Sequence, residues 1–333
     1  MRRGFVAGLA GLAVLCLAGC GQSPQASPPQ AASTPGTSSG SAAAPSAPAH
    51  APHLRIRPAG FRLPSAFGRE AVINTGQYAV VGGGLLAGDT STASAYQLDP
   101  GAAQVSAMPS LPVPVHDTAG GLASGIPIVI GGGNASEQSV VQGWNGHEWH
   151  VLGHLPQARS DLVAATVGQQ VIVLGGYKGS RPAEPTILRT SNGRVWNSIG
   201  TLPVPVRYAA STVADGSIWL FGGETDNVER KAIQRVDPET GQAQLVGKLP
   251  VGLGHAVAIP LGSRILIAGG RLTPNTVTDR MWWFDPSTGA VTPAGHLPHP
   301  LADSAVTRKG DVFYLVGGET PSFTDGILAV TYH

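Results

Sequence analysis

Residues 202–223 read LPVPVRYAASTVADGSIWLFGG, a stretch that begins with Leu-Pro and ends with Gly-Gly. The same frame occurs six times along the chain. The Leu-Pro steps begin at Leu63, Leu111, Leu155, Leu202, Leu249 and Leu297, and the glycine pairs begin at Gly82, Gly131, Gly175, Gly222, Gly269 and Gly317. The offset from Leu to Gly is 19 in the first unit and 20 in the others, and the units repeat every 44 to 49 residues. A period of this size built from short strands predicts a blade-repeat propeller rather than a helical solenoid.

Each unit contains segments typical of four antiparallel strands. The run before each glycine pair is continuously β-branched or aromatic, as in residues 128–130 (IVI) and 219–221 (WLF), which suits a strand buried on both faces. Turn signatures such as residues 237–241 (DPETG) follow the third strand, where Pro presets φ and Gly accepts a positive φ. The expected fold class is all-β, a six-bladed β-propeller of four-stranded antiparallel blades.

The two ends of the repeat array complement each other. After the last glycine pair only one further strand is expected, at residues 327–332, so the sixth blade lacks its fourth strand. Residues 54–63 resemble a fourth strand with no blade before it, because RPAG at 57–60 parallels TPAG at 292–295. We therefore expect an N-terminal strand to close the last blade.

The first 20 residues are typical of a targeting segment. Arg2 and Arg3 precede an apolar run at residues 5–17, and LAGC at 17–20 resembles the lipobox of bacterial lipoprotein signal peptides. The resemblance implies lipidation of Cys20 and a protein anchored by lipid at the extracytoplasmic side of the cell membrane or envelope. An ordinary cleaved signal and a short membrane anchor are the alternatives, and either Sec or twin-arginine export fits the two arginines. Residues 21–53 carry no Asp, Glu, Lys or Arg and are expected to form a disordered tether before a propeller at 54–333.

Composition excludes several classes of function. Lys and Arg together number 21 and Asp and Glu 20, so no basic excess favours nucleic acid as a partner. Both cysteines, Cys16 and Cys20, lie in the targeting segment, so disulfides, thiolate zinc sites and cysteine nucleophiles are excluded from the expected propeller. We expect no cofactor, no metal and a monomer. HEWH at residues 147–150 lacks the spacing of a zinc protease, and GTSSG at 36–40 matches a hydrolase motif only within the tether.

The repeated hydrophobic run, glycine pair, variable loop and Asp-Pro-x-Thr-Gly turn, with Trp149 and Trp196 in the fourth strands, resemble the kelch repeat over residues 54–333. Other units carry an aliphatic residue such as Leu245 at the tryptophan position, so the chain resembles a divergent member. The resemblance implies a propeller of a family that mostly serves as an interaction platform. A WD-repeat assignment is disfavoured because the chain has no Trp-Asp dipeptide.

The residues that follow each Leu-Pro and each Gly-Gly are expected to meet on one face, around the mouth of the central channel. Arg, Asp, Glu, His and Tyr alternate there, which favours a polar ligand, including one whose carboxylate is held by Arg forks. The alternative for any one of them is a structural role at a strand end. The predicted ligand-binding residues are Arg69, Asp117, Arg159, Asp161, Arg207, Tyr208, Glu224, His255, Arg271, Asp303 and Glu319.

Two functions from different classes fit this sequence. The first is a non-enzymatic module anchored to the cell envelope that binds a glycan, peptide or protein through the channel mouth. The second is a sugar-acid epimerase or mutarotase, because six-bladed kelch-like proteins include sialic acid epimerases. That chemistry needs an acid/base group and a carboxylate clamp, for which Glu224 or His255 and Arg207 or Arg271 are the candidates. We expect the binding module, and catalysis is the alternative.

Overall fold

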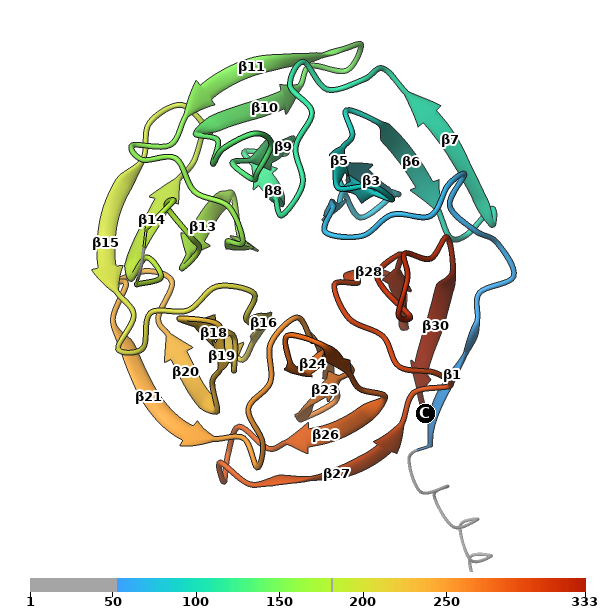
Figure 1. The fold of residues 1–333 in the computed structure, drawn as a ribbon, viewed down its shortest axis with the longest axis vertical. Helices are drawn as coiled ribbons and strands as arrows, with labels where there is room; N and C mark the ends of the chain where they lie inside the picture. The colour runs from blue at the N-terminus through green and yellow to red at the C-terminus, as the bar shows by residue number, and fades with distance from the viewer. Residues whose placement is uncertain (1–52, 181) are drawn as a thin grey trace, which may run out of the picture. The chain divides into compact units, whose positions relative to one another are not determined.

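The computed structural model describes residues 53–180 and 182–333, which form a six-bladed β-propeller of 30 strands around a central channel (Figure 1). The prediction of six four-stranded antiparallel blades is confirmed. The predicted signal segment with Cys20, and the predicted tether apart from His53, lie outside the described residues. Within the described ranges, no helix has the length and apolar character needed to cross a membrane.

In the first three blades, the strands follow one another from the channel outward. Blade 1 comprises β2 (Ala71–Asn74), β3 (Ala79–Gly82), β6 (Ala95–Asp99) and β7 (Gln104–Met108). Blade 2 comprises β8 (Ala119–Ala123), β9 (Ile126–Ile130), β10 (Val140–Trp144) and β11 (Trp149–His154). Blade 3 comprises β12 (Val163–Val167), β13 (Gln170–Leu174), β14 (Thr186–Thr190) and β15 (Asn197–Thr201).

The second half of the disc repeats this order until the last strand. Blade 4 comprises β16 (Ala210–Ala214), β17 (Ser217–Phe221), β20 (Ala232–Val236) and β21 (Ala243–Lys248). Blade 5 comprises β22 (Val257–Leu261), β23 (Arg264–Ala268), β26 (Arg280–Phe284) and β27 (Val291–His296). Blade 6 comprises β28 (Ala305–Lys309), β29 (Val312–Val316), β30 (Ile327–Tyr332) and β1 (Leu54–Pro58).

The N-terminal strand closes the ring, as the sequence predicts. Strand β1 pairs antiparallel with β30 from Leu54 opposite Tyr332 to Pro58 opposite Leu328. The last blade therefore takes three strands from the C-terminal end of the chain and one from the beginning of the propeller (Figure 1). The innermost strands of all six blades contact each other in a closed cycle.

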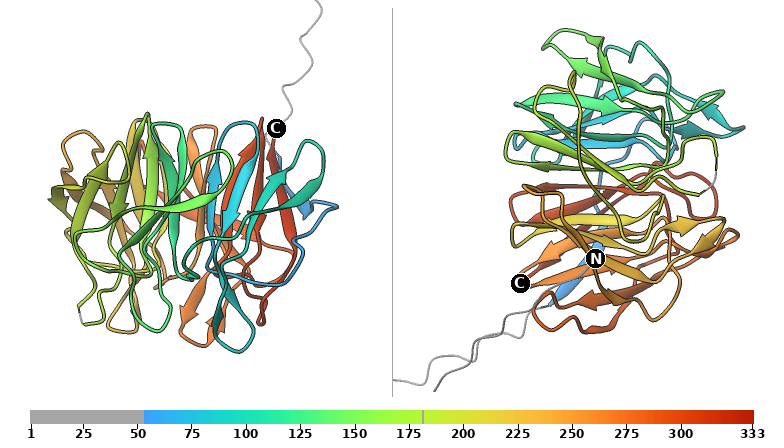
Figure 2. Two further views of the ribbon diagram at one scale, coloured as in Figure 1. Left: turned by 90° about the horizontal axis from the view of Figure 1, so that it is seen from above. Right: turned by 90° about the vertical axis from the view of Figure 1, so that its left-hand side faces the viewer.

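Three blades carry an additional two-stranded hairpin directly after their glycine pairs. The hairpins are β4 (Leu85–Leu86) with β5 (Thr90–Ser91), β18 (Glu224–Thr225) with β19 (Val228–Glu229), and β24 (Arg271–Thr273) with β25 (Thr276–Val277). Figure 2 shows the disc from the side, with the blade strands running between its two faces and the connecting loops gathered at those faces.

The glycine pairs join each blade to the next. The second glycine of every pair donates its N–H to a carbonyl of the following blade, at 2.8 to 3.1 Å. The six acceptors are the carbonyls of Val115, Arg159, Val206, Leu253, Leu301 and Phe67. A Cβ on the first glycine of a pair would lie only 1.9 to 2.8 Å from the same carbonyl. Glycine is therefore required because no side chain fits between adjacent blades at this point.

The structure corrects the register of the first unit. The sequence has three consecutive glycines at residues 82–84, and the prediction takes Gly82 as the start of the pair. In the structure, Gly82 ends strand β3, whereas Gly83 and Gly84 have positive φ and make the inter-blade contacts. The offset from Leu63 to the functional pair is therefore the same as in the other five units.

The hydrophobic core is divided into six parts, each lying between two adjacent blades. Between blades 4 and 5, for example, Trp219 and Phe221 of β17 pack with Ile265 and Ile267 of β23. A corresponding cluster between blades 6 and 1 includes residues of β30 and β3, so the junction closed by β1 has a core like the others. Burial of these apolar faces fixes the blades side by side and thereby fixes their inner ends around the channel.

Buried glutamines hold two of the loops that lead to the channel mouth. The amide of Gln142, in β10, donates to the carbonyl of Val113 and accepts from its N–H, at 3.0 and 2.8 Å. Gln234, in β20, makes the same pair of bonds with Val204, at 3.0 and 2.9 Å. Each glutamine anchors the segment just after a Leu-Pro step, a few residues before the chain reaches the mouth.

Candidate functional site: the channel mouth

One residue from each blade forms the innermost circle of the mouth. Each has a left-handed backbone with φ between 49° and 64°, which non-glycine residues rarely adopt. We call these the ring residues: Arg69, Asp117, Asp161, Tyr208, His255 and Asp303. All six are among the predicted ligand-binding residues. Six strained positions in equivalent places indicate that the fold holds these side chains at the channel axis.

Backbone hydrogen bonds link the ring residues around the channel. In five of the six neighbouring pairs, the N–H of one ring residue donates to the carbonyl of the preceding one, at 2.9 to 3.3 Å. Arg69 N–H, for example, donates to Asp303, which joins blade 1 to blade 6. Among the described residues, only the link from Asp117 to Arg69 is not made. The circle is therefore open between blades 1 and 2.

Short bridges bring the two predicted sets of residues together. In each blade, the residue just before the ring residue pairs with a residue just after the glycine pair. Arg207 pairs in this way with Glu224, and neighbouring bridges place Arg271 and Glu319 beside the ring. Residues following Leu-Pro and residues following Gly-Gly therefore meet at the mouth, as the topology of the repeat predicts.

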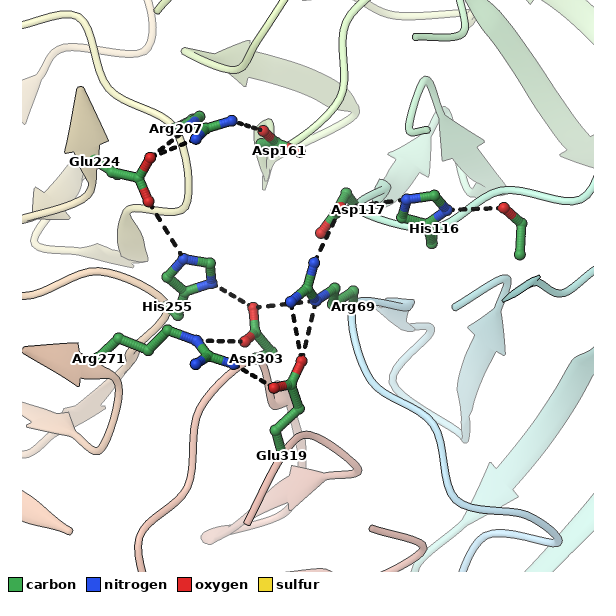
Figure 3. Close-up of polar contacts among 11 residues, drawn as sticks. Arg69, His116, Asp117, Asp161, Arg207, Glu224, His255, Arg271, Asp303 and Glu319 are labelled. Carbon is green, nitrogen blue, oxygen red and sulfur yellow. Dashed lines mark hydrogen bonds and ion pairs between the residues drawn. The ribbon is translucent and has the colours of Figure 1, made fainter. Parts of the chain in front are cut away.

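A continuous chain of charged contacts crosses blades 3 to 6 (Figure 3). Arg207 donates to Asp161 at 3.0 Å and, through Nε, to Glu224 at 3.0 Å. The other oxygen of Glu224 lies 3.8 Å from His255 Nε2, and His255 Nδ1 lies 2.5 Å from Asp303 Oδ1. These side chains come from four blades, so the charges at the mouth interact across the blade junctions.

The same chain continues across the junction between blades 6 and 1 (Figure 3). Arg271 donates to Asp303 at 3.4 Å and also forms an ion pair with Glu319. Arg69 donates to Glu319 at 3.0 Å and lies 3.9 Å from Asp303 and 3.5 Å from Asp117. The three arginines of the mouth are thus already paired with the protein's own carboxylates.

Ion pairing lowers the pKa of two mouth carboxyls. Burial alone raises the pKa of Asp303, but His255, Arg69 and Arg271 outweigh it and bring the pKa to about 2. For Glu224, hydrogen bonds from His255 and Arg207 likewise outweigh burial, and the pKa is about 2. Burial lowers the pKa of His255, yet Asp303 and Glu224 together raise it to about 9. His255 is therefore an imidazolium at neutral pH.

Other carboxyls near the mouth have raised pKa values. Burial, together with the charge of Asp161, raises the pKa of Asp117 to about 7, although Arg69 opposes this shift. Burial also raises the pKa of Asp161 against the opposing effect of Arg207. Glu70 is 5% exposed and neither of its oxygens has a hydrogen-bond partner, so burial raises its pKa well above the usual range.

Aromatic rings complete one wall of the mouth. The Tyr208 ring stacks on the His255 imidazole with centroids 3.9 Å apart. The Arg207 guanidinium lies 5.0 Å from the Tyr177 ring centroid and 5.4 Å from that of Tyr208. Cations over aromatic faces gain additional stabilisation, so blades 3 to 5 hold Arg207 and His255 in fixed positions.

Three cavities lie along the channel and its mouth. A cavity of about 120 Å³ lies at the centre and is lined by Asp117, Asp161, Tyr208 and other residues of the inner circle. A second, of about 180 Å³, lies beside it, lined by Tyr177, Arg207 and Asn227 among others. A deeper cavity of about 250 Å³ is lined mainly by small side chains of the innermost strands. The mouth is therefore hollow at its centre.

One predicted site residue lies elsewhere. Arg159 is 2% exposed, and its guanidinium donates to the carbonyls of Gly175 and Thr186 inside blade 3 rather than facing the mouth. Every other predicted ligand-binding residue lies at the mouth.

Two further residues join the network that the sequence did not predict. Asn227 accepts from Arg207 at 3.1 Å, and Ser91 bonds to His116 at 2.8 Å. Both lie on the additional hairpins, which have no repeated sequence signal.

Sequence comparison finds relatives among kelch proteins. No protein-family model matches the chain. It is 26% identical over 162 residues to beta-scruin of Limulus polyphemus, covering 45% of this chain and 18% of beta-scruin. It is 27% identical over 201 residues to the Kelch-like protein terF of Aspergillus terreus, covering 56% and 44% respectively. The matched regions span less than half the length of these relatives.

Two further similarities are to a bacterial epimerase and to a protein of known structure. The N-acetylneuraminate epimerase of Pasteurella multocida is 25% identical over 158 residues, which is 37% of this chain and 41% of the epimerase. Among solved structures, that of YjhT superposes with a TM-score of 0.71 at 17% sequence identity, covering 82% of this chain and 99% of YjhT. The structural likeness shows a common fold.

Proposed function

Since the chain is a divergent kelch-repeat propeller, we propose that it is a non-enzymatic binding module whose ligand docks at the channel mouth. The ligand is a glycan, a peptide or a segment of a partner protein. The relatives named Kelch-like proteins support a binding role, but fold alone assigns no ligand. The proposal therefore rests on the site itself.

One observation carries the proposal: charged side chains from all six blades converge on one mouth (Figure 3), and this mouth also has an aromatic wall and a central cavity. Concave sites with a few convergent polar groups are typical ligand sites. The six left-handed backbone positions support the same conclusion, because strain of this kind concentrates where side chains must be held for function.

The proposal includes placement at the cell envelope through lipid on Cys20. Its support is the sequence LAGC at residues 17–20 and the uncharged segment that follows. Replacement of Cys20 by Ala in the full-length chain tests it. We expect the wild-type protein to incorporate radiolabelled palmitate and to sediment with membranes, and the variant to do neither. A variant that still carries the label would exclude Cys20 as the lipid site.

Binding at the mouth is tested with the double variant Arg207→Ala, Arg271→Ala. Glycan arrays and crosslinking to envelope proteins identify a ligand for the wild-type propeller, and the variant is expected to lose at least 90% of that signal. Arg280→Ala is the matched control, because this arginine is exposed on β26 outside the ionic network. If the double variant retained full binding while remaining folded, the mouth would not be the binding site.

A second candidate function is a sugar-acid epimerase or mutarotase. It is favoured by the similarity to N-acetylneuraminate epimerase and by an imidazolium, His255, between two carboxylates. A base works best when its pKa lies near the working pH, so Asp117 suits that role better than Glu224. NMR anomer-exchange measurements with sialic acid decide between the functions. Exchange accelerated by wild type and lost in Asp117→Asn supports the enzyme, whereas binding without acceleration supports the module.

A further inference from the structure

One carboxyl beside the central cavity of the mouth has an acceptor atom without a donor. Asp117 lines this cavity and is 9% exposed, yet its Oδ1 atom has no hydrogen-bond partner. Its other oxygen lies 3.5 Å from Arg69 and 3.5 Å from His116 Nε2. A buried carboxylate oxygen is ordinarily hydrogen-bonded, so an unpartnered one on a side chain that lines a cavity indicates a missing donor.

The arginines do not offer a free donor site for a ligand carboxylate. Each contacts two or more internal carboxylates, namely Arg69 with Asp117, Asp303 and Glu319, Arg207 with Asp161 and Glu224, and Arg271 with Asp303 and Glu319. A ligand carboxylate would have to displace one of these partners. Donor groups of the mouth are therefore engaged, whereas an acceptor is free.

The charge balance at the mouth also favours a positively charged ligand. The cations are Arg69, Arg207, Arg271 and protonated His255, and the carboxyls in contact with them are Asp117, Asp161, Glu224, Asp303 and Glu319. When Asp117 and Asp161, whose pKa values are raised, are both ionised, the carboxylates outnumber the cations by one. An added positive charge would neutralise the site, whereas an added negative charge would increase the imbalance.

The backbone places the free acceptor at the one opening of the inner circle. Asp117 and Arg69 are the neighbouring ring residues that are not joined by a backbone hydrogen bond. Asp117 is joined on its other side to Asp161, whose N–H donates to the Asp117 carbonyl at 2.9 Å. The two aspartates therefore lie next to each other on the wall of the cavity.

Resting on the proposed binding function, we propose that the central cavity receives a protonated amine of the ligand. Its N–H groups donate to the Asp117 carboxylate, and its positive charge faces Asp117 and Asp161. The cavity of about 120 Å³ is large enough for an ammonium group and its first carbons, with the rest of the ligand outside. In the described part of the chain, no group of three or more His, Cys, Asp or Glu residues is placed to hold a metal ion, so an organic cation fits better.

The proposal predicts coupling between amine binding and the proton of Asp117. The charged or titratable groups around Asp117 are Arg69, His116, Asp161, Tyr208, His255 and Asp303. Because the pKa of Asp117 is about 7, the carboxyl is mostly protonated at pH 6 and must release this proton when a cation binds. At pH 8 the carboxyl is already ionised, so a ligand whose amine is still protonated should bind more tightly and release no proton.

Calorimetry with glucosamine tests the proposal, with N-acetylglucosamine as the uncharged probe of similar shape. At pH 6, where the amine is protonated, we expect glucosamine to bind the wild-type propeller at least tenfold more tightly and to release a proton, as measured in two buffers of different ionisation enthalpy. At pH 8, where most of the free amine is neutral, binding of the ammonium form should take up a proton instead. Asp117→Asn should abolish both effects. Glu148→Gln, an exposed carboxyl on the turn between β10 and β11, should change neither.

Three outcomes would overturn the proposal. Equal binding of the two sugars would remove the role of the amine, and unchanged glucosamine binding by a folded Asp117→Asn variant would remove the site. Competition by calcium chloride that depends on Asp117 would assign the cavity to a metal instead. If Asp117→Asn does not fold, Asp161→Asn provides the second variant, with an expected loss of at least tenfold.

This experiment also separates the proposal from the function on which it rests. If the Arg207→Ala, Arg271→Ala variant loses the identified partner while glucosamine fails to bind, the mouth is a binding site but the amine proposal is wrong. If glucosamine binds at Asp117 but the Arg207→Ala, Arg271→Ala variant binds the partner as tightly as wild type does, the amine site is real and the proposed function is wrong.

Discussion

Asp117 and Asp303 occupy equivalent ring positions in blades 2 and 6, yet their protonation differs. Asp303 contacts His255, Arg271 and Arg69, and its pKa is about 2. Asp117 has one oxygen near Arg69 and the other without a partner, and its pKa is about 7. Both side chains are more than 90% buried, so burial does not explain the difference. The cations that neighbouring blades supply decide whether a buried carboxyl in this repeat is charged.

The largest expected effect comes from removing the strand that holds blade 6, which carries Asp303 and Glu319. Deletion of residues 55–63 removes most of β1 and its pairing with β30. Several kcal/mol of stability depend on such a closure, and each kcal/mol is worth about 2–4 °C in a chain of this size, so we expect Tm to fall by about 10 °C or more. Differential scanning calorimetry measures it. An unchanged melting temperature would show that the ring closes without β1.

Asp303→Asn should destabilise the protein strongly at pH 7. The variant removes one carboxylate partner from each of three cations, Arg69, His255 and Arg271. Removing one partner of a buried ion pair costs about 3–5 kcal/mol. Urea unfolding of this variant and of Asp117→Asn, side by side, gives the comparison directly. Equal losses in the two variants would contradict the difference in pairing described above.

The charge on His255 should make the stability of the protein sensitive to alkaline pH. Its folded pKa of about 9 exceeds the ordinary value of 6.5, so its stabilisation is complete below pH 6.5 and is lost as pH rises through 9. We expect a loss of up to about 3 kcal/mol across this window. Thermal melts from pH 6 to 10, with His255→Gln as control, measure it. A variant that follows the same curve as wild type would assign the loss to another group.

Asp117→Asn should have the smallest effect, within about 1 kcal/mol at pH 7, because an isosteric neutral group replaces a carboxyl that burial keeps partly protonated. A carboxyl with a raised folded pKa stabilises below its ordinary value of 3.8, and this contribution is lost as pH rises through 7. The stability of the variant relative to wild type should therefore increase from pH 4 to pH 8. Urea unfolding at these two pH values measures it, and a decrease would mean that Asp117 is ionised throughout.

The repeat predicts the fold because its signals are backbone requirements. Leu-Pro and Gly-Gly recur where inter-blade hydrogen bonds and close packing leave no room for variation, so the blade count and the closing strand follow from spacing. The register of the first unit could have been chosen correctly from spacing, because the offset of 20 in the other five units selects Gly83 after Leu63, and the inter-blade contact confirms this glycine.

The mouth was predictable as a location but not as a set of contacts. Arg159 lies two residues before ring residue Asp161, and the residues two before the other ring positions are all buried and apolar: Phe67, Val115, Val206, Leu253 and Leu301. An alignment on the ring positions would therefore have placed Arg159 inside the blade. The pairing of each arginine depends on side chains from other blades, and no spacing along the chain specifies it.

The open link between Asp117 and Arg69 lies one blade away from the strand that completes the propeller. Widening of the inner circle by an incoming ligand would therefore begin between blades 1 and 2, where no backbone hydrogen bond joins the two ring residues. The outer pairing of β1 with β30, on which circular integrity depends, would bear none of that strain. Ligand entry and ring closure would thus involve different junctions of the propeller.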